Sequence, residues 1–304
     1  MLHKKSFHAM GCQMQALVDG DFIHTRALDE VPGWFEGWEQ VLSRFRPESE
    51  LSRLNREPGW STPVSQTLWD VFLASIAAET LTGGLVTPTV YDALIQAGYD
   101  RSFETLPRQQ ILPNRPMWSA VSALEKILWD AATQTICIPP GIHLDLGGVA
   151  KGWAAHQAAQ KLSAFAPALV DAAGDVSISG PQTSGKAWPV GIADPFDPSK
   201  NLVVLHLSGG GVATSGRDRR NWTQNAQPRH HIIDPRSGQP AQTDLLTVTI
   251  VAPSVMEAEA AAKAVFILGS YAGLEWLAQY PEMAALLVLQ DGRWLFTEPM
   301  QAYL

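Results

Sequence analysis

The glycine pair Gly147-Gly148 stands where a strand-like pattern ends and a helix-like pattern begins. Residues 142–146 alternate apolar and polar side chains, which is the period of a half-buried strand, and the residues from Val149 onward favour a helix. Paired glycines let backbone approach a ligand, and the amides at the start of a helix attract anions such as phosphate. The pattern therefore predicts either an anion-binding turn charged by Lys151 or a plain tight turn with Lys151 in solvent.

The length, composition and net charge of the chain limit the kinds of molecule that it is expected to bind. The chain has 304 residues, of which 46% are hydrophobic and 17% charged, so it is long enough for one large domain or two with an ample core. Its formal net charge of −8 argues against a nucleic-acid-binding protein and against adhesion to anionic lipid. A phosphate ligand would have to be held by local geometry.

Cysteine usage and the N-terminal residues bear on the compartment. Cys12 and Cys137 are too few for a disulfide scaffold or a cysteine-based metal site, and no apolar run approaches the ~20 residues of a membrane span. Ala9–Cys12 has the ending of a lipoprotein signal, but residues 1–8 supply no apolar core for one. We therefore expect Cys12 in the first strand, no membrane insertion and a cytoplasmic protein, or a periplasmic one if the sequence was trimmed.

Strand-like and helix-like segments are mixed without regular βαβ alternation, which favours an α+β fold with largely antiparallel sheet. The expected helices are 32–42, a short one capped by Ser49, 65–80, 91–97, 150–163 and 255–268. The expected strands are 10–18, a hairpin of 132–140 with 142–146, a strand over 167–179 with a bulge or ligand approach at Gly174-Asp175, and 188–193, 203–207, 211–215 and 245–252. Residues 221–227 are expected to form a mobile loop, and Asp234–Gly238 a turn.

Several breaks at strand ends combine glycine with small polar residues. Together with Lys151 they favour a pocket for a large phosphorylated cofactor, although each alone is typical of a surface turn: Gly83-Gly84, Gly147-Gly148, Gly174-Asp175 and Thr214–Gly216. His230-His231 beside Asp234 is consistent with a general base and its orienting carboxylate, or with a structural pair before a turn.

Taken together and in order, the motifs resemble those of the FAD:protein FMN transferases, the ApbE family of flavin transferases. The matching motifs cover nearly the whole chain: Met10-Gly11, Ser49–Asn55, Thr87–Val90, Asp145–Gly152, Ala172–Asp175, Ala193–Pro195, Thr214–Gly216 and His230–Gly238. The resemblance implies a T-fold-like α+β architecture, with residues 1–304 as one domain, or as two subdomains with a central flavin-binding cleft between them.

The resemblance also implies a chemistry. Members of the family bind FAD with Mg²⁺ at its pyrophosphate, cleave it there, and transfer FMN to a Thr or Ser hydroxyl of a target flavoprotein. Some instead hydrolyse FAD to FMN and AMP. Phosphoryl transfer mostly needs positioning and charge neutralisation, which agrees with an anion-binding turn. The implied partners are FAD and an acceptor flavoprotein.

Roles for single residues follow from the matching positions. His231 matches the histidine proposed to assist removal of the acceptor hydroxyl proton. The positions implied to bind the cofactor are Met10, Glu50, Asn55, Thr89, Gly147, Gly148, Lys151, Asp175 and Thr214.

The chain departs from the family where the metal should bind. The family's last long helix carries an Asp and a Thr that bind the metal together with the backbone carbonyl at the position of Ala150. Here the two positions hold Glu259 and Lys263, four residues apart and so on one helical face. Lysine has donors and no acceptor, so it cannot be a metal ligand, and its charge repels a divalent ion.

Three alternatives remain open at this point. Lys263 takes the metal's place as a charge, which leaves a slow metal-independent enzyme or a flavin-binding protein without turnover. Alternatively, Lys263 swings outward and Glu259 with Ala150 still holds Mg²⁺, or the two residues form an exposed ion pair on a helix that has lost its function. Smaller departures are His156, Asp171 and Ala173, where the family has Asp, Asn and Gly.

Overall fold

The computed structural model describes residues 1–21, 25–111 and 124–304. These residues form two compact units. The first comprises Met1–Glu36, Lys151–Asp218 and Thr243–Leu304, and the second comprises Gly37–Ala150 and Arg219–Gln242. Because both units draw on distant stretches of chain, residues far apart in the sequence meet within each of them.

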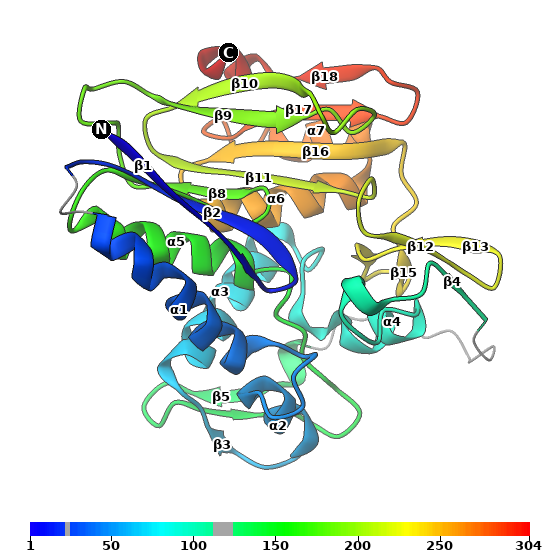
Figure 1. Ribbon diagram of the computed structural model, residues 1–304. Helices are drawn as coiled ribbons and strands as arrows, with labels where there is room; N and C mark the ends of the chain where they lie inside the picture. The colour runs from blue at the N-terminus through cyan, green and yellow to red at the C-terminus, as the bar shows by residue number, and fades with distance from the viewer. Residues whose placement is uncertain (22–24, 112–123) are drawn as a thin grey trace. The chain divides into compact units, whose positions relative to one another are not determined.

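The first unit is built on an eight-stranded sheet in which every neighbouring pair of strands is antiparallel (Figure 1). Across the sheet the strands are β1 (Leu2–Ala9), β2 (Cys12–Asp19), β7 (Ala168–Asp171), β8 (Asp175–Ile178), β11 (Gly210–Gly216), β16 (Leu245–Ala252), β17 (Ala284–Leu289) and β18 (Trp294–Phe296). A separate antiparallel pair consists of β9 (Trp188–Ala193) and β10 (Asn201–Leu207). The expected class, α+β with largely antiparallel sheet, is confirmed.

Helix α6 (Val255–Leu268) packs along β11 and β16. Its alanines at 258, 260, 261, 262 and 264 are all buried, and these small side chains let the helix approach the sheet closely. The other helices with residues in this unit are α1 (Thr25–Leu42), α5 (Ala150–Ser163), α7 (Ser270–Leu277) and the 3₁₀ helix η5 (Glu298–Tyr303). The sheet and the β9–β10 pair share a core that includes Trp188, Leu205 and Leu207.

The second unit combines short helices with short strands. The helices are α2 (Glu50–Arg56), α3 (Gln66–Thr82), α4 (Tyr91–Gln96) and the 3₁₀ helices η2 (Pro88–Val90), η3 (Phe103–Thr105) and η4 (Leu124–Lys126). Its sheets are β3 (Thr62–Pro63) with β6 (Thr135–Cys137) and β5 (Leu128–Asp130), β13 (Gln227–His230) with β12 (Asn221–Gln224) and β4 (Gln109–Gln110), and β14 (Ile233–Asp234) with β15 (Gln239–Pro240). Ser49 and Ser65 cap α2 and α3 through their side chains, so both predicted helix starts are confirmed.

The N-terminal strand prediction is wrong in one respect. Residues 10–18 are not one strand, because Met10 and Gly11 form the turn between β1 and β2, with φ of 50° and 66°. Cys12 is consequently the first residue of the second strand. Helix α1 also begins at Thr25, seven residues before the predicted start at Pro32. A single internal proline removes one N–H from the helix without ending it here.

Residues 142–146 do not form the predicted strand. Their backbone bonds to other groups: Leu144 exchanges two hydrogen bonds with the Asn55 side chain, and the Asp145 N–H donates to the Pro88 carbonyl. The hairpin predicted for this region is formed by β5 and β6 instead. Period-two alternation therefore did not identify the hydrogen-bond partners of this segment.

Two other expectations for turns and loops are corrected. Residues 221–227 are not a loop, since β12 and β13 pair as a hairpin there. The break at Gly174-Asp175 is not a bulge within one strand, because β7 and β8 are two paired strands joined by a turn. Ala173 in that turn has φ of 63°, a region that favours glycine. The Asp234–Gly238 turn is confirmed by the Gly238 N–H donating to the Asp234 carbonyl.

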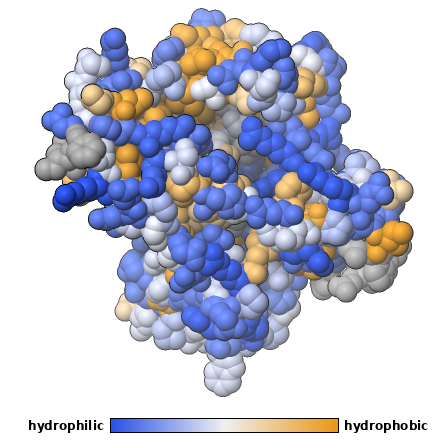
Figure 2. Space-filling view, in the orientation of Figure 1, coloured by the Kyte–Doolittle hydropathy of each residue, from blue (hydrophilic) through white to orange (hydrophobic). Residues whose placement is uncertain are grey.

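Among the described residues, no helix is long and apolar enough to cross a membrane. The face of the molecule in Figure 2 is dominated by hydrophilic residues, with apolar side chains in small separate areas. This surface agrees with the moderate hydrophobic fraction of the chain.

Candidate functional site

Four charged side chains meet inside the first unit. Lys151 lies at the start of α5, Asp175 at the start of β8, and Glu259 and Lys263 one turn apart on α6. The Lys151 ammonium pairs with the Asp175 carboxylate and lies 3.8 Å from Glu259 Oε1. Lys263 Nζ lies 2.9 Å from the same Oε1. We refer to these four residues as the lysine–carboxylate cluster.

Burial differs within the cluster. The carboxylate side chains of Glu259 and Asp175 are 1% and 3% exposed, whereas those of Lys263 and Lys151 are 16% and 19% exposed. Burial raises the pKa of the Glu259 carboxyl; the Lys263 ammonium opposes that rise, Asp175 adds to it and Lys151 opposes it. The two carboxylates are therefore the buried members of the cluster, and the two ammonium groups paired with them are the partly exposed members.

Gly152 fixes the position of Glu259 from the other side. Its backbone N–H donates to Glu259 Oε2 at 3.0 Å. A Cβ at this position would stand 2.5 Å from that same oxygen, closer than any ordinary contact. A larger residue here would force the Glu259 carboxylate or α5 to shift, so glycine allows the close packing of α5 against α6 at this position.

A divalent metal does not fit this cluster. Both oxygens of Glu259 are engaged, Oε1 by the lysines and Oε2 by the Gly152 amide, and Asp175 is paired with Lys151. A metal ion at Oε1 would stand against an ammonium that has no acceptor to offer it. Among the described residues, no group of three or more His, Cys, Asp or Glu side chains is arranged to hold a metal. The predicted ligand Ala150 is the buried first residue of α5.

The alternatives for Lys263 are now distinguishable. Its ammonium is not turned outward but donates to Glu259, and the pair is not an exposed one, since Glu259 is fully buried. The first alternative, in which the ammonium takes the place of the metal, stays a proposal.

The second unit contains a buried ion pair of a different kind. Arg44 Nε lies 2.5 Å from Asp145 Oδ2, and the two side chains are 6% and 8% exposed. The guanidinium also donates to the Tyr99 carbonyl and lies 4.2 Å and 4.7 Å from the ring centroids of Phe45 and Tyr99. Sequence analysis missed Arg44, because its segment Ser43–Arg46 also contains Ser43 and a second arginine and gives no sign of burial.

The glycine turn is held by side chains of the same unit. Asn55 accepts from the Leu144 N–H at 2.8 Å and donates to the Leu144 carbonyl at 2.9 Å. Asp145 Oδ1 accepts from the Gly147 N–H at 2.6 Å. Asn55, predicted near the cofactor, therefore fixes the backbone just before Gly147-Gly148 through two hydrogen bonds. Asp145 links that turn to Arg44.

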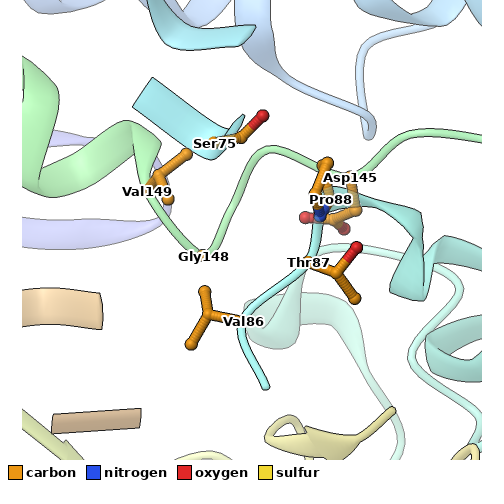
Figure 3. Close-up of a pocket in the computed structure, with 7 residues that line it drawn as sticks. All are labelled: Ser75, Val86, Thr87, Pro88, Asp145, Gly148 and Val149. Atoms are coloured by element: carbon orange, nitrogen blue, oxygen red, sulfur yellow. The ribbon is translucent and has the colours of Figure 1, made fainter. Parts of the chain in front are cut away.

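A small pocket opens beside the glycine turn. Figure 3 shows the pocket residues, with Val86, Thr87 and Pro88 on one stretch of backbone and Asp145, Gly148 and Val149 on another; the lining is completed by Ser75. Its cavity volume of about 10 Å³ is that of about one water molecule, far below a typical ligand pocket of roughly 300 Å³ or more. Taken alone the pocket cannot admit a dinucleotide. Thr89 is buried beside it, with its hydroxyl 2.9 Å from that of Thr87.

The remaining predicted residues lie at structured positions. Met10 is in the β1–β2 turn, and Thr214 on β11 shares a hydrogen bond with Thr249 at 2.9 Å. Glu50 Oε1 accepts from the Ser65 N–H at 2.6 Å, so its carboxylate is used at the start of α3. Asp171 accepts from the Gly174 N–H and thereby stabilises the β7–β8 turn.

The two adjacent histidines have different surroundings. His230 is buried, donates from Nε2 to the Ala241 carbonyl at 2.9 Å and accepts from the Ile232 N–H, which is a structural role. His231 follows at the bend after β13 and is half-buried. The carboxylate of Asp234, expected as the orienting group, is bound by the Arg236 guanidinium through both oxygens at 2.9 Å.

The fold and the cluster define an α+β protein in which two partly exposed ammonium groups are supported by buried carboxylates. Comparison with known proteins gives the family: the ApbE family model matches residues 10–287, and the chain belongs to the ApbE family. The family predicted from the motifs is confirmed.

Relatives and solved structures agree with this assignment. A FAD:protein FMN transferase of Treponema pallidum is 31% identical over 285 residues, covering 88% of this chain and 78% of the relative. A Haemophilus influenzae protein of the same name is 27% identical and covers 94% and 86%. The crystal structure of the ApbE protein of Thermotoga maritima superimposes with a TM-score of 0.88 at 26% identity, covering 100% and 99%.

Proposed function

We propose that this protein binds FAD and transfers its FMN part to a Thr or Ser hydroxyl of an acceptor flavoprotein. The observation that carries the proposal is membership of the ApbE family over residues 10–287, with relatives named FAD:protein FMN transferase aligned over most of both chains. The lysine–carboxylate cluster supports it, because its two ammonium groups suit the negative charge of a pyrophosphate.

The reaction divides into attack, departure and proton transfer. The acceptor hydroxyl oxygen forms a bond to the phosphorus on the FMN side of the pyrophosphate, the bond from that phosphorus to the bridging oxygen breaks, and AMP leaves with the electron pair. The hydroxyl proton passes to a base, for which we propose His231. The protein supplies mainly positioning and charge neutralisation in such a reaction.

The cofactor-binding roles predicted for single residues belong to this proposal. Direct contact with FAD is proposed for Met10, Glu50, Thr89, Gly147, Gly148, Lys151 and Thr214, and for the buried Asp175 we propose cofactor binding through Lys151, with which it pairs. For Asn55 we propose a positioning role, because its amide already bonds to the backbone of Leu144.

The test is incubation of the purified protein with FAD and a peptide that carries an acceptor Thr. We expect AMP release together with a fluorescent, FMN-bearing peptide. AMP without labelled peptide would instead identify a FAD pyrophosphatase, and a yellow protein with neither product would identify a flavin-binding protein without turnover.

His231→Ala sharpens this test. We expect FAD binding to persist while peptide labelling falls about 10²-fold to 10⁴-fold, the usual contribution of a positioned base. The matched control is His206→Ala, an exposed histidine on β10. Unchanged labelling in the His231 variant would remove His231 from the proposal.

A further inference from the structure

The lysine–carboxylate cluster is neutral overall but unequal in its exposure. Two ammonium groups balance two carboxylates; the carboxylates are almost fully buried, and the lysine side chains are the partly exposed members. A neutral cluster with buried anions and accessible cations presents positive charge outward. It is therefore suited to an anionic ligand rather than to a cationic one.

Lys263 has donors left for such a ligand. Its ammonium donates to Glu259 Oε1 at 2.9 Å, with the Glu259 carbonyl oxygen at 3.5 Å. An ammonium has three donors, so the bonds to Glu259 hold Lys263 in place without using all of its N–H groups. Because Glu259 is itself fixed by the Gly152 N–H, the position of the Lys263 charge is set by buried groups on α5 and α6.

The same geometry excludes a divalent ion from that position. Mg²⁺ needs oxygen ligands at roughly 2.0–2.1 Å in a nearly octahedral arrangement. Around Glu259 Oε1, the groups within 4 Å that bear charge include Lys263 Nζ at 2.9 Å and Lys151 Nζ at 3.8 Å. A metal bound to Oε1 would have to displace both ammonium groups from the carboxylate that they share on α6.

We propose that the Lys263 ammonium, held by Glu259, takes the place of a divalent metal at the pyrophosphate of the dinucleotide, so that this protein binds FAD without a metal ion. The inference rests on the proposed function, since it names the means by which that site neutralises its substrate. Lys263 contacts the pyrophosphate directly, and Glu259 is a positioning residue.

The first test uses the unaltered protein. FAD binding is measured by titration calorimetry in excess EDTA and in excess Mg²⁺, and we expect the same dissociation constant in both. Binding that requires Mg²⁺ would overturn the inference while leaving the proposed function standing. Absence of binding under both conditions would overturn the proposed function, and this inference with it.

The second test replaces the ammonium by an oxygen. For Lys263→Thr we expect FAD affinity in EDTA to fall by about tenfold or more, as for loss of a close charge pair. Mg²⁺ should restore part of it, because the introduced threonine hydroxyl would offer an oxygen beside Glu259. The control, Lys200→Thr, removes a lysine whose side chain is 74% exposed and should leave both affinities unchanged.

A direct measurement of metal binding separates a charge effect from loss of the fold. Mn²⁺ is titrated into both proteins without FAD and followed by electron paramagnetic resonance, with thermal unfolding as a check on folding. We expect Mn²⁺ binding by the Lys263→Thr protein and none by the unaltered one at the same concentration. Equal Mn²⁺ binding by the two proteins would overturn the inference.

Discussion

The two units each contain a buried ion-pair site, and the two sites are built differently. In the second unit Arg44 and Asp145 are paired one to one, and both side chains are more than nine-tenths buried. In the first unit Lys151 and Lys263 share two carboxylates, and only the carboxylates are buried to that degree. In the Arg44–Asp145 pair both charged groups are buried, whereas in the lysine–carboxylate cluster the two ammonium groups remain partly exposed.

The choice of cation explains this difference. The planar guanidinium of Arg44 lies against aromatic rings and donates in fixed directions, which suits a sealed structural pair. An ammonium on a flexible stem can keep one donor on its carboxylate and offer others to a ligand. The comparison therefore separates a site that maintains the glycine turn from one that we propose binds the pyrophosphate of the substrate.

The largest effect on stability is expected at the sealed pair. Arg44→Met should lower the free energy of unfolding by about 3–5 kcal/mol, because it leaves the Asp145 carboxylate buried without its partner. Denaturant titration followed by tryptophan fluorescence measures this change. FAD binding by the folded fraction is a second readout, since Asp145 holds the Gly147 amide.

Arg293→Met is the matched control for that substitution. Arg293 pairs with Asp291 at 2.8 Å, but the two side chains are 73% and 54% exposed. We expect a change of less than about 1 kcal/mol, as is usual for surface pairs. Equal losses in the Arg44 and Arg293 variants would show that burial does not distinguish the two pairs.

An intermediate effect is expected at Gly152, which bears on the accessible cluster. In Gly152→Ala the new Cβ would meet Glu259 Oε2 at 2.5 Å, so the carboxylate or α5 must move. We expect a loss of roughly 1–3 kcal/mol from this overpacking, together with weaker FAD binding because Lys263 loses its fixed partner. Thermal unfolding and FAD titration of the same variant measure the two effects.

Gly33→Ala is the control for Gly152→Ala. Gly33 also lies in a helix, but a Cβ there has no neighbour within 4 Å. Alanine should be neutral or stabilising by up to about 1 kcal/mol at such a position. If the Gly152 variant behaved like the Gly33 variant, tight packing of α5 on Glu259 would not be what positions the cluster.

Local patterns in the sequence predicted those parts of the fold that depend on local chemistry. The helices 150–163 and 255–268 and the strands 188–193 and 245–252 have the predicted bounds, because periodicity and caps determine them. Residues 142–146 were predicted as a strand, although Asn55 and Pro88 supply their hydrogen-bond partners. Such partners come from distant residues, and alternation in one segment carries no information about them.

One ion pair of the candidate site could be predicted from the sequence. The exchange of a metal-ligand pair for Glu259 and Lys263 predicted an ion pair on one helical face, and the structure contains it. The Arg44–Asp145 pair was not predicted, because its members are 101 residues apart and neither lies at an unusual position in its own segment. The role of each pair depends on how deeply its side chains are buried, and burial is set by the folded structure rather than by the local sequence.

The smallest effect is expected at His156, which shares α5 with Lys151 but lies outside the lysine–carboxylate cluster. Burial lowers the pKa of His156 below its ordinary value of 6.5, so the folded protein favours the neutral ring. As pH falls below about 6.5, the unfolded chain therefore takes up this proton first, and folding stability decreases until the folded state is protonated too. His156→Leu should make stability less dependent on pH across this window while leaving it unchanged above it, as measured by denaturant midpoints at a series of pH values. An unaltered pH dependence would show that His156 is no less hydrated in the folded protein than an ordinary histidine.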